Sequence, residues 1–190
     1  KPKRKDFIKL YNIITNSGLE DYTAPFASDS FYVSSANKND SYGLFVYILD
    51  GKAALETSDV HAGNYALKLL ASNSNIGNDP DDGSKLIWKV NDPDDPYYPK
   101  TPYYGLHTVK YWVKCVGGAT GYLVINNYYD YKSTILNTHN TPGWTLNVVD
   151  YAPNPLWPGW QLWINCVNKS DDPGICVLVD DVTDEFRLQE

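Results

Sequence analysis

Methionine, long apolar runs and the motifs of common catalytic sites are all missing from this sequence. No apolar run approaches the roughly 18 residues that a membrane-spanning helix needs, so we expect no membrane span. The absence of Met, even at position 1, predicts an excerpt or a processed form from which any targeting signal has been removed. There is no GxSxG or HExxH motif, and the three histidines, His61, His107 and His139, lie in unrelated segments. The sequence therefore offers no recognisable catalytic constellation.

The net charge of −7 argues against nucleic acid as a partner, because the phosphate backbone selects basic surfaces. The one basic run, "KPKRK" at 1–5, contains a proline and no aromatic residue, which favours a solvated linker. We expect residues 1–6 to form a linker or tail. Residues 7–190 are long enough for one domain that buries about 70% of the surface of its unfolded chain.

The three cysteines, Cys115, Cys166 and Cys176, form no CxxC metal-binding spacing. Cys166 and Cys176 flank the segment "VNKSDDPGI" symmetrically, so in a hairpin they would face one another. The sequence leaves two readings open, a cross-strand disulfide between this pair or three buried thiols.

Turn-forming residues recur throughout the chain, and short runs rich in Val, Ile, Tyr, Trp and Thr lie between them. Short β-rich runs separated by turn-forming residues are typical of an all-β sandwich or barrel, and signals for helices are almost absent. The pattern predicts strands at 8–14, 30–34, 43–49, 52–57, 64–71, 85–90, 106–116, 121–128, 134–137, 144–151, 161–167 and 174–182. We therefore predict an all-β fold, a β-sandwich of two packed antiparallel sheets.

A short repeat, "NDPDD", occurs at 78–82 and again at 91–95 and brackets the predicted strand "KLIWKV". Clusters of proline and aspartate at both ends of a strand indicate turns. The carboxylates are also able to gather a cation, but neither copy has the alternating acidic order of an EF-hand loop.

Most aromatic residues carry a polar group on the ring, since the chain has 16 Tyr and 6 Trp but only 5 Phe. Since alternate strand residues point to opposite faces, their parity separates a core row from an outer row. In three predicted strands the outer row carries a large ring beside amides or lysines. The residues of this outer set are Gln161, Trp163 and Asn165, then Lys110 and Trp112, then Tyr122 and Asn126.

Exposed rings rimmed by hydrogen-bonding groups usually mark a binding site, because an exposed Trp forfeits the free energy of burial. Such a surface suits a sugar, whose C–H groups lie on the ring while its hydroxyls bond to amides and lysines. The alternative is a β-bulge that shifts the parity and places Trp112 or Trp163 in the core. In "NPLWPGWQLW", Trp157 and Trp160 lie among prolines and glycine, on a loop that either plugs the end of the sandwich or forms the rim of the binding surface.

Five segments together resemble jelly-roll carbohydrate-binding modules with a galactose-binding-domain-like fold. These are "NIITNSGLEDYT" at 12–23, "HAGNYALKL" at 61–69, "TVKYWVK" at 108–114, "PGWTLNV" at 142–148 and "CVLVDDV" at 176–182. They resemble, in order, the N-G-F-E-D opening, the "sGkysLkl" strand, the "WvK" strand, the "gWt" strand and the closing "iDDv" strand of these modules. The segment 75–104 has no counterpart. In such modules the ligand lies on a sheet face or on end loops.

The resemblance also implies a structural calcium ion that ties the first strand to the last. Its ligands here would be the carboxylates of Glu20 and Asp180 and backbone carbonyls near Gly18 and Asn64, with Asp181 as the alternative to Asp180. Carboxylate and carbonyl oxygens are the ligands that Ca²⁺ prefers.

We therefore expect a non-catalytic carbohydrate-binding module, secreted or at the cell surface, within a larger carbohydrate-active protein. It would bind a polysaccharide through Trp112 and Trp163, with Trp160 at the rim. A structural or adhesive sandwich that docks a partner through the ringed face is the main alternative, since Tyr and Trp are also enriched in protein interfaces. An enzyme that degrades polysaccharides is a further alternative, because glycosidases use paired carboxylates such as those in "DDVTDE".

Overall fold

The structure is a computed structural model, and it describes residues 8–12, 14, 30–33, 44–47, 52–90 and 104–189. Within these residues there is no helix, and hence none long and apolar enough to cross a membrane. The strands are β1 (Ile8–Asn12), β2 (Ser30–Val33), β3 (Leu44–Tyr47), β4 (Ala53–Glu56), β5 (Ala66–Leu70), β6 (Lys85–Val90), β7 (His107–Val116), β8 (Gly121–Asn127), β9 (Ser133–His139), β10 (Thr145–Tyr151), β11 (Trp160–Asn165) and β12 (Cys176–Gln189). Each overlaps a segment predicted from the spacing of turn-forming residues, although β12 continues past the predicted end at 182 to Gln189, and the predicted all-β sandwich is confirmed.

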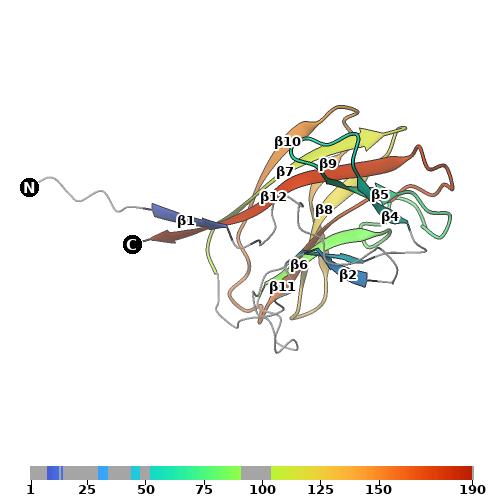
Figure 1. Cartoon of the computed structure of the whole chain (residues 1–190). Coiled ribbons are helices and arrows are strands. Elements are labelled where there is room, and N and C mark those ends of the chain that lie inside the picture. Colours follow the sequence, from blue (N-terminus) through green and yellow to red (C-terminus); the bar gives the residue numbers. More distant parts are fainter. Residues whose placement is uncertain are drawn as a thin grey trace, which may run out of the picture.

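The strands form two antiparallel sheets that pack face to face (Figure 1). The first sheet has the order β10-β7-β12-β5-β4, with β1 paired to the end of β12. The second has the order β2-β3-β6-β11-β8-β9. Strands that are neighbours in a sheet are mostly distant in sequence. The last strand, β12, lies between β7 and β5 in the middle of the first sheet.

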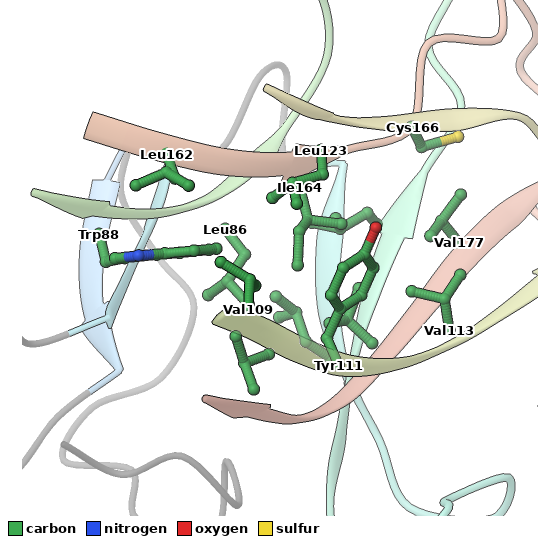
Figure 2. Packing of buried hydrophobic residues seen from close by; sticks show 14 of the residues in the cluster. Leu86, Trp88, Val109, Tyr111, Val113, Leu123, Leu162, Ile164, Cys166 and Val177 are labelled. Atoms are coloured by element: carbon green, nitrogen blue, oxygen red, sulfur yellow. The ribbon is translucent and has the colours of Figure 1, made fainter. Parts of the chain in front are cut away.

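Large apolar side chains from both sheets fill the space between them (Figure 2). Trp88, Leu162 and Ile164 come from the second sheet, and Tyr111 and Val177 from the first; each is completely buried. These residues follow the alternation of their strands, in which every second side chain points inward. Because these side chains point into the core, the residues between them on each strand point outward.

A β-bulge changes which residues of β12 face the core. Its pairing with β7 shifts between Asp180 and Thr183, and Asp181 has a positive φ of 49°. Before the bulge Val177 and Val179 point inward, whereas after it Val182 and Asp184 are completely buried. The extra residue therefore reverses the parity of the strand and turns an aspartate into the interior.

The buried carboxylate of Asp184 is a hydrogen-bond acceptor that joins the two sheets. Trp88 Nε1 of the second sheet donates to Asp184 Oδ2 at 3.0 Å, and the hydroxyl of Tyr151 donates to the same atom at 2.7 Å. His107 Nδ1 lies 2.8 Å from Oδ1, and Trp160 Nε1 donates to the Tyr151 hydroxyl at 3.2 Å. Burial raises the pKa of Tyr151 well above its ordinary value, so its hydroxyl keeps the proton that it donates. A carboxyl group without solvent access thus has hydrogen-bond partners from several strands.

Removing this acceptor should strongly destabilise the fold. We expect Asp184→Ala to lower the free energy of unfolding by about 3–5 kcal/mol, because the Trp88 and Tyr151 donors lose their partner in the interior. The milder Asp184→Asn should cost less, since an amide oxygen still accepts. Urea denaturation followed by circular dichroism measures both. The control is Asp171→Asn, an exposed carboxylate 3.6 Å from Lys52 Nζ, which should change stability by no more than about 0.5 kcal/mol. Equal effects at the two positions would contradict this role for Asp184.

Candidate functional site

The outer residues predicted from strand parity lie on two opposite faces of the sandwich. Trp112 and Lys110 are on β7 of the first sheet, whereas Trp163 is on β11 of the second (Figure 1). The prediction of which side chains face outward is correct for both strands. Tyr111 and Leu162 face the core, whereas the adjacent Trp112 and Trp163 do not belong to it. The prediction of one common surface is wrong. Alternation distinguishes inward from outward but carries no information about the sheet to which a strand belongs.

The outer face of the second sheet carries three parallel rows of side chains, and we call it the amide face. The strand registers place Lys89, Gln161, Asn126 and Ser133 in the first row, Ile87, Trp163, Val124 and Ile135 in the second, and Lys85, Asn165 and Tyr122 in the third. An apolar stripe is thus bordered on both sides by amides and lysines. The structure brings Gln161, Trp163, Asn165, Tyr122 and Asn126 together as predicted.

Hydrogen bonds hold the amides of the first row in fixed orientations. Gln161 Nε2 donates to Asn126 Oδ1 at 3.4 Å, and Asn126 Nδ2 donates to Ser133 Oγ at 3.1 Å. Asn126 is almost buried, while Gln161 remains half-exposed at the surface. The half-exposed Gln161 amide is therefore held in place by Asn126, which Ser133 holds in turn.

A loop formed by residues 78–82, which we call the Pro80 loop, makes hydrogen bonds to one residue in each of the three rows. The Pro80 carbonyl accepts from Trp163 Nε1 at 2.9 Å and from Asn165 Nδ2 at 2.8 Å. Asp81 Oδ1 accepts from Ser133 Oγ at 2.6 Å. The segment is the first "NDPDD" copy, which was predicted as a turn; the second copy, at 91–95, lies outside the described residues.

Trp163 is therefore not the open ring that the sequence indicated. Only 4% of its surface is exposed, and it packs with Ile87 and Val124 under the Pro80 loop. Lys85 Nζ lies 4.5 Å from the ring centroid, a distance at which a cation is attracted to an aromatic face. Replacing Trp163 by Ala would remove packing as well as the ring. It is thus an unsuitable single probe of binding.

Trp160 requires a second correction. It opens β11 instead of lying on the preceding loop, and its side chain is completely buried in the core. The inward parity of Leu162 and Ile164 extends back to it, so Trp160 belongs to the interior and not to the rim. Trp157 is half-buried against the same core, and the Tyr104 hydroxyl donates to its carbonyl.

Trp112 lies on the outer face of the first sheet, where another ring stacks on it and ion pairs lie on the same face. The His61 ring stacks on it with centroids 3.8 Å apart and planes 16° from parallel. Lys110 Nζ lies 3.2 Å from Glu185 Oε2, and Lys114 Nζ lies 2.6 Å from Asp59 Oδ2. One side of the Trp112 ring is thus occupied by a residue of the chain itself.

Asp180, a predicted calcium ligand, is completely buried next to this Trp112 cluster. Its Oδ2 accepts from the backbone N–H groups of His61 and Ala62, both at 3.1 Å. Burial raises the pKa of Asp180 to about 6, and the charge of Asp181 adds to this effect. His61, Asp180 and Asp181 each offer an atom within 4.8 Å of the others, so they form a candidate cation site. Asn64 is exposed in the same turn as His61, while Gly18 and Glu20 lie outside the described residues.

The three cysteines are free and buried, so the reading as three thiols is confirmed and the Cys166–Cys176 disulfide is not formed. Burial raises the pKa of Cys115 to about 12 and that of Cys166 to about 11. The thiols therefore stay protonated and contribute as small apolar groups.

Two exposed aromatic residues beside the amide face were missed by the sequence reasoning. Tyr129 and Tyr131, in the turn between β8 and β9, are 66% and 64% exposed. The segment "NNYYDYKS" at 126–133 contains three tyrosines at a predicted turn, and that local enrichment was the available signal.

Comparisons with known proteins identify the fold but no sequence relative. No family model matches the sequence, and no curated protein matches it. TmCBM61 in complex with β-1,4-galactotriose is 14% identical, with a TM-score of 0.53, and the match covers 95% of this chain and 99% of that one. A CBM4 structure is 13% identical, also with a TM-score of 0.53, and covers 92% and 99%. The chain therefore has the β-sandwich fold of jelly-roll carbohydrate-binding modules.

Proposed function

We propose that the protein is a non-catalytic module that binds a polysaccharide on the amide face. The observation that carries the proposal is the arrangement of rows, in which an aromatic and aliphatic stripe lies between rows of amides and lysines. Sugars need both kinds of contact, since their C–H groups pack on apolar surface and their hydroxyls both donate and accept hydrogen bonds. The shared fold with a module that was solved with β-1,4-galactotriose supports the same class of ligand.

The Pro80 loop determines how the ligand would reach the stripe. In the structure the loop supplies the oxygens that accept from Trp163, Asn165 and Ser133. Sugar hydroxyl oxygens are acceptors of the same kind, so a ligand that displaces the loop could satisfy the same donors. Gln161 and Tyr122 are half-exposed while the loop is in place, and they would make the first contacts.

The position of His107 does not support a catalytic role for this histidine. The His107–Asp184 pair resembles part of a catalytic relay, yet both side chains are completely buried and Asp184 is occupied by Trp88 and Tyr151. A general base must reach the proton that it removes from a substrate. This pair has no such access and acts within the core.

A docking role is the second candidate, favoured by the outer face of the first sheet. Leu146, which pairs with Trp112, is 46% exposed, and Val148, which pairs with Lys110, is 56% exposed. Exposed aliphatic residues beside a Trp suit a protein surface better than a sugar. If this face carries the function, binding will depend on Trp112 and Lys110 and not on Gln161.

We further propose that a calcium ion binds at Asp180, with Glu20 and carbonyls near Gly18 and Asn64 as the remaining ligands. In support, β1 pairs antiparallel with the end of β12, and its register runs from Ile8 opposite Gln189 to Asn12 opposite Glu185, that is, toward Asp180. Asp181 lies beside it, and a cation would offset the cost of burying the Asp180 carboxylate. The ion would tie the first strand to the last and take no part in any reaction.

The larger context is also part of the proposal. We infer that the module acts outside the cell, joined to other domains of a carbohydrate-active protein. A non-catalytic binding surface is useful when it holds a linked domain at an insoluble or polymeric substrate, because the linkage raises the effective concentration of that domain.

The binding surface is tested by affinity electrophoresis through gels containing β-1,4-galactan, glucan, mannan, xylan or pectin. We expect one polysaccharide to retard the protein. Gln161→Ala should weaken that binding about fivefold, in line with a lost hydrogen bond worth about 1 kcal/mol. Lys110→Ala, a half-exposed polar residue on the opposite face, is the matched control and should bind as the unchanged protein does. Loss of retardation in Lys110→Ala alone would move the function to the first sheet, and no retardation by any polysaccharide would contradict the proposal.

The calcium proposal is tested by thermal unfolding at pH 7 with EDTA or with excess Ca²⁺. At a hundredfold excess over Kd, a single site should raise Tm by about 5–10 °C. Asp180→Asn should abolish this difference, whatever its own effect on Tm, because it removes a charged ligand. Asp171→Asn, an exposed acid elsewhere, should retain it. An identical Tm with EDTA and with Ca²⁺ would rule out the site.

A further inference from the structure

The turn between β8 and β9 carries two largely exposed tyrosines. Tyr129 and Tyr131 are 66% and 64% exposed, so neither ring contributes a full burial free energy to folding. Exposed rings beside hydrogen-bonding groups are characteristic of recognition surfaces.

The backbone of this turn is held in one conformation by its own side chains. Asn127 Oδ1 accepts from the N–H groups of Tyr129 and Asp130, both at 2.9 Å. Asp130 Oδ1 accepts from the N–H of Lys132 at 3.2 Å. The two rings therefore project from a fixed backbone, which lowers the entropy lost when a ligand binds to them.

Tyr131 occupies a position that local conformational preference would give to another residue. Its φ is +58°, in the left-handed region that Gly, Asn and Asp adopt at lower cost than an aromatic residue. Its ring meets that of Tyr128 edge to face, with centroids 6.3 Å apart and planes at 73°. Tyr131 thus combines a strained backbone with an exposed ring that the Tyr128 ring helps to orient. Backbone strain of this kind clusters at functional sites.

The turn is also joined to the amide face. The Tyr131 carbonyl accepts from Asn126 Nδ2 at 2.9 Å, and Asn126 Oδ1 accepts from Gln161 Nε2. A chain of contacts therefore runs from Gln161 through Asn126 to the tyrosine turn at the end of β8. The Pro80 loop binds this region through Ser133 and leaves both tyrosine rings exposed.

We propose that Tyr129 and Tyr131 form a second aromatic contact for the polysaccharide, beyond the first row of the amide face, where the turn joins β8 to β9. This inference rests on the proposed function, because it extends the same binding surface. A sugar chain that crosses the first row would leave the amides of Gln161 and Asn126 and pack successive units on the two tyrosine rings. These rings are reachable with the Pro80 loop in place, so they would also hold the chain before the stripe is uncovered.

The experiment measures affinity and Tm for Tyr131→Asn and Tyr129→Ala, using the polysaccharide that retards the unchanged protein. We expect each change to lower affinity about tenfold, a typical loss for an aromatic anchor of an interface. Asn accepts a positive φ more readily than Tyr, so Tyr131→Asn should not lower Tm. Leu156→Ala, at a residue 73% exposed on another loop, is the control and should change neither quantity.

The outcomes separate this inference from the proposed function. Unchanged affinity in both tyrosine variants, together with weaker binding in Gln161→Ala, would overturn the tyrosine contact and leave the amide face as the site. A fall in Tm in Tyr131→Asn would overturn it as well, since the tyrosine would then have a structural role. If no polysaccharide binds the unchanged protein, the proposed function fails and the extension fails with it.

Discussion

The hydrogen bonds to the buried carboxylate of Asp184 are the interaction on which the rest of the structure depends. This one group accepts from Trp88 in the second sheet and from Tyr151 in the first, and it lies beside His107. A buried charge tolerates few arrangements, because each missing donor would leave a large desolvation cost. The network therefore links the two sheets through donors from both of them.

The bulge in β12 makes that network available and also shapes the surface next to it. By reversing the parity after Asp181, it places Asp184 inside while Asp180, before the bulge, lies opposite Trp112. The two acids of the "DD" pair thus have different environments, one buried under the 61–62 backbone and one paired with His61 at 2.8 Å. The amide face lies on the other side of the sandwich, on strands that the core holds in register.

Strand positions and the inward rows could be predicted from the sequence, because turn residues and alternation are local properties. The relative position of Trp112 and Trp163 could not be predicted in this way. Their strands belong to different sheets, and only the pairing of segments distant in sequence shows which sheet each strand joins. Burial of Trp163 by Pro80 is likewise a contact between residues far apart in the chain. The bulge in β12 adds a residue that no turn signal marks. Trp160 was misplaced because prolines and a glycine precede it.

The central claim, that the amide face binds the polysaccharide, is tested most directly by an NMR titration with an oligosaccharide of the retarding polymer. Side-chain amide signals of Gln161 and Asn126 and the indole N–H signal of Trp163 report on this face, and the indole signals of Trp112 and Trp144 report on the first sheet. We expect saturable shifts in the first group and none in the second. Shifts confined to Trp112 and Trp144 would contradict the account and place the binding surface on the other side of the sandwich.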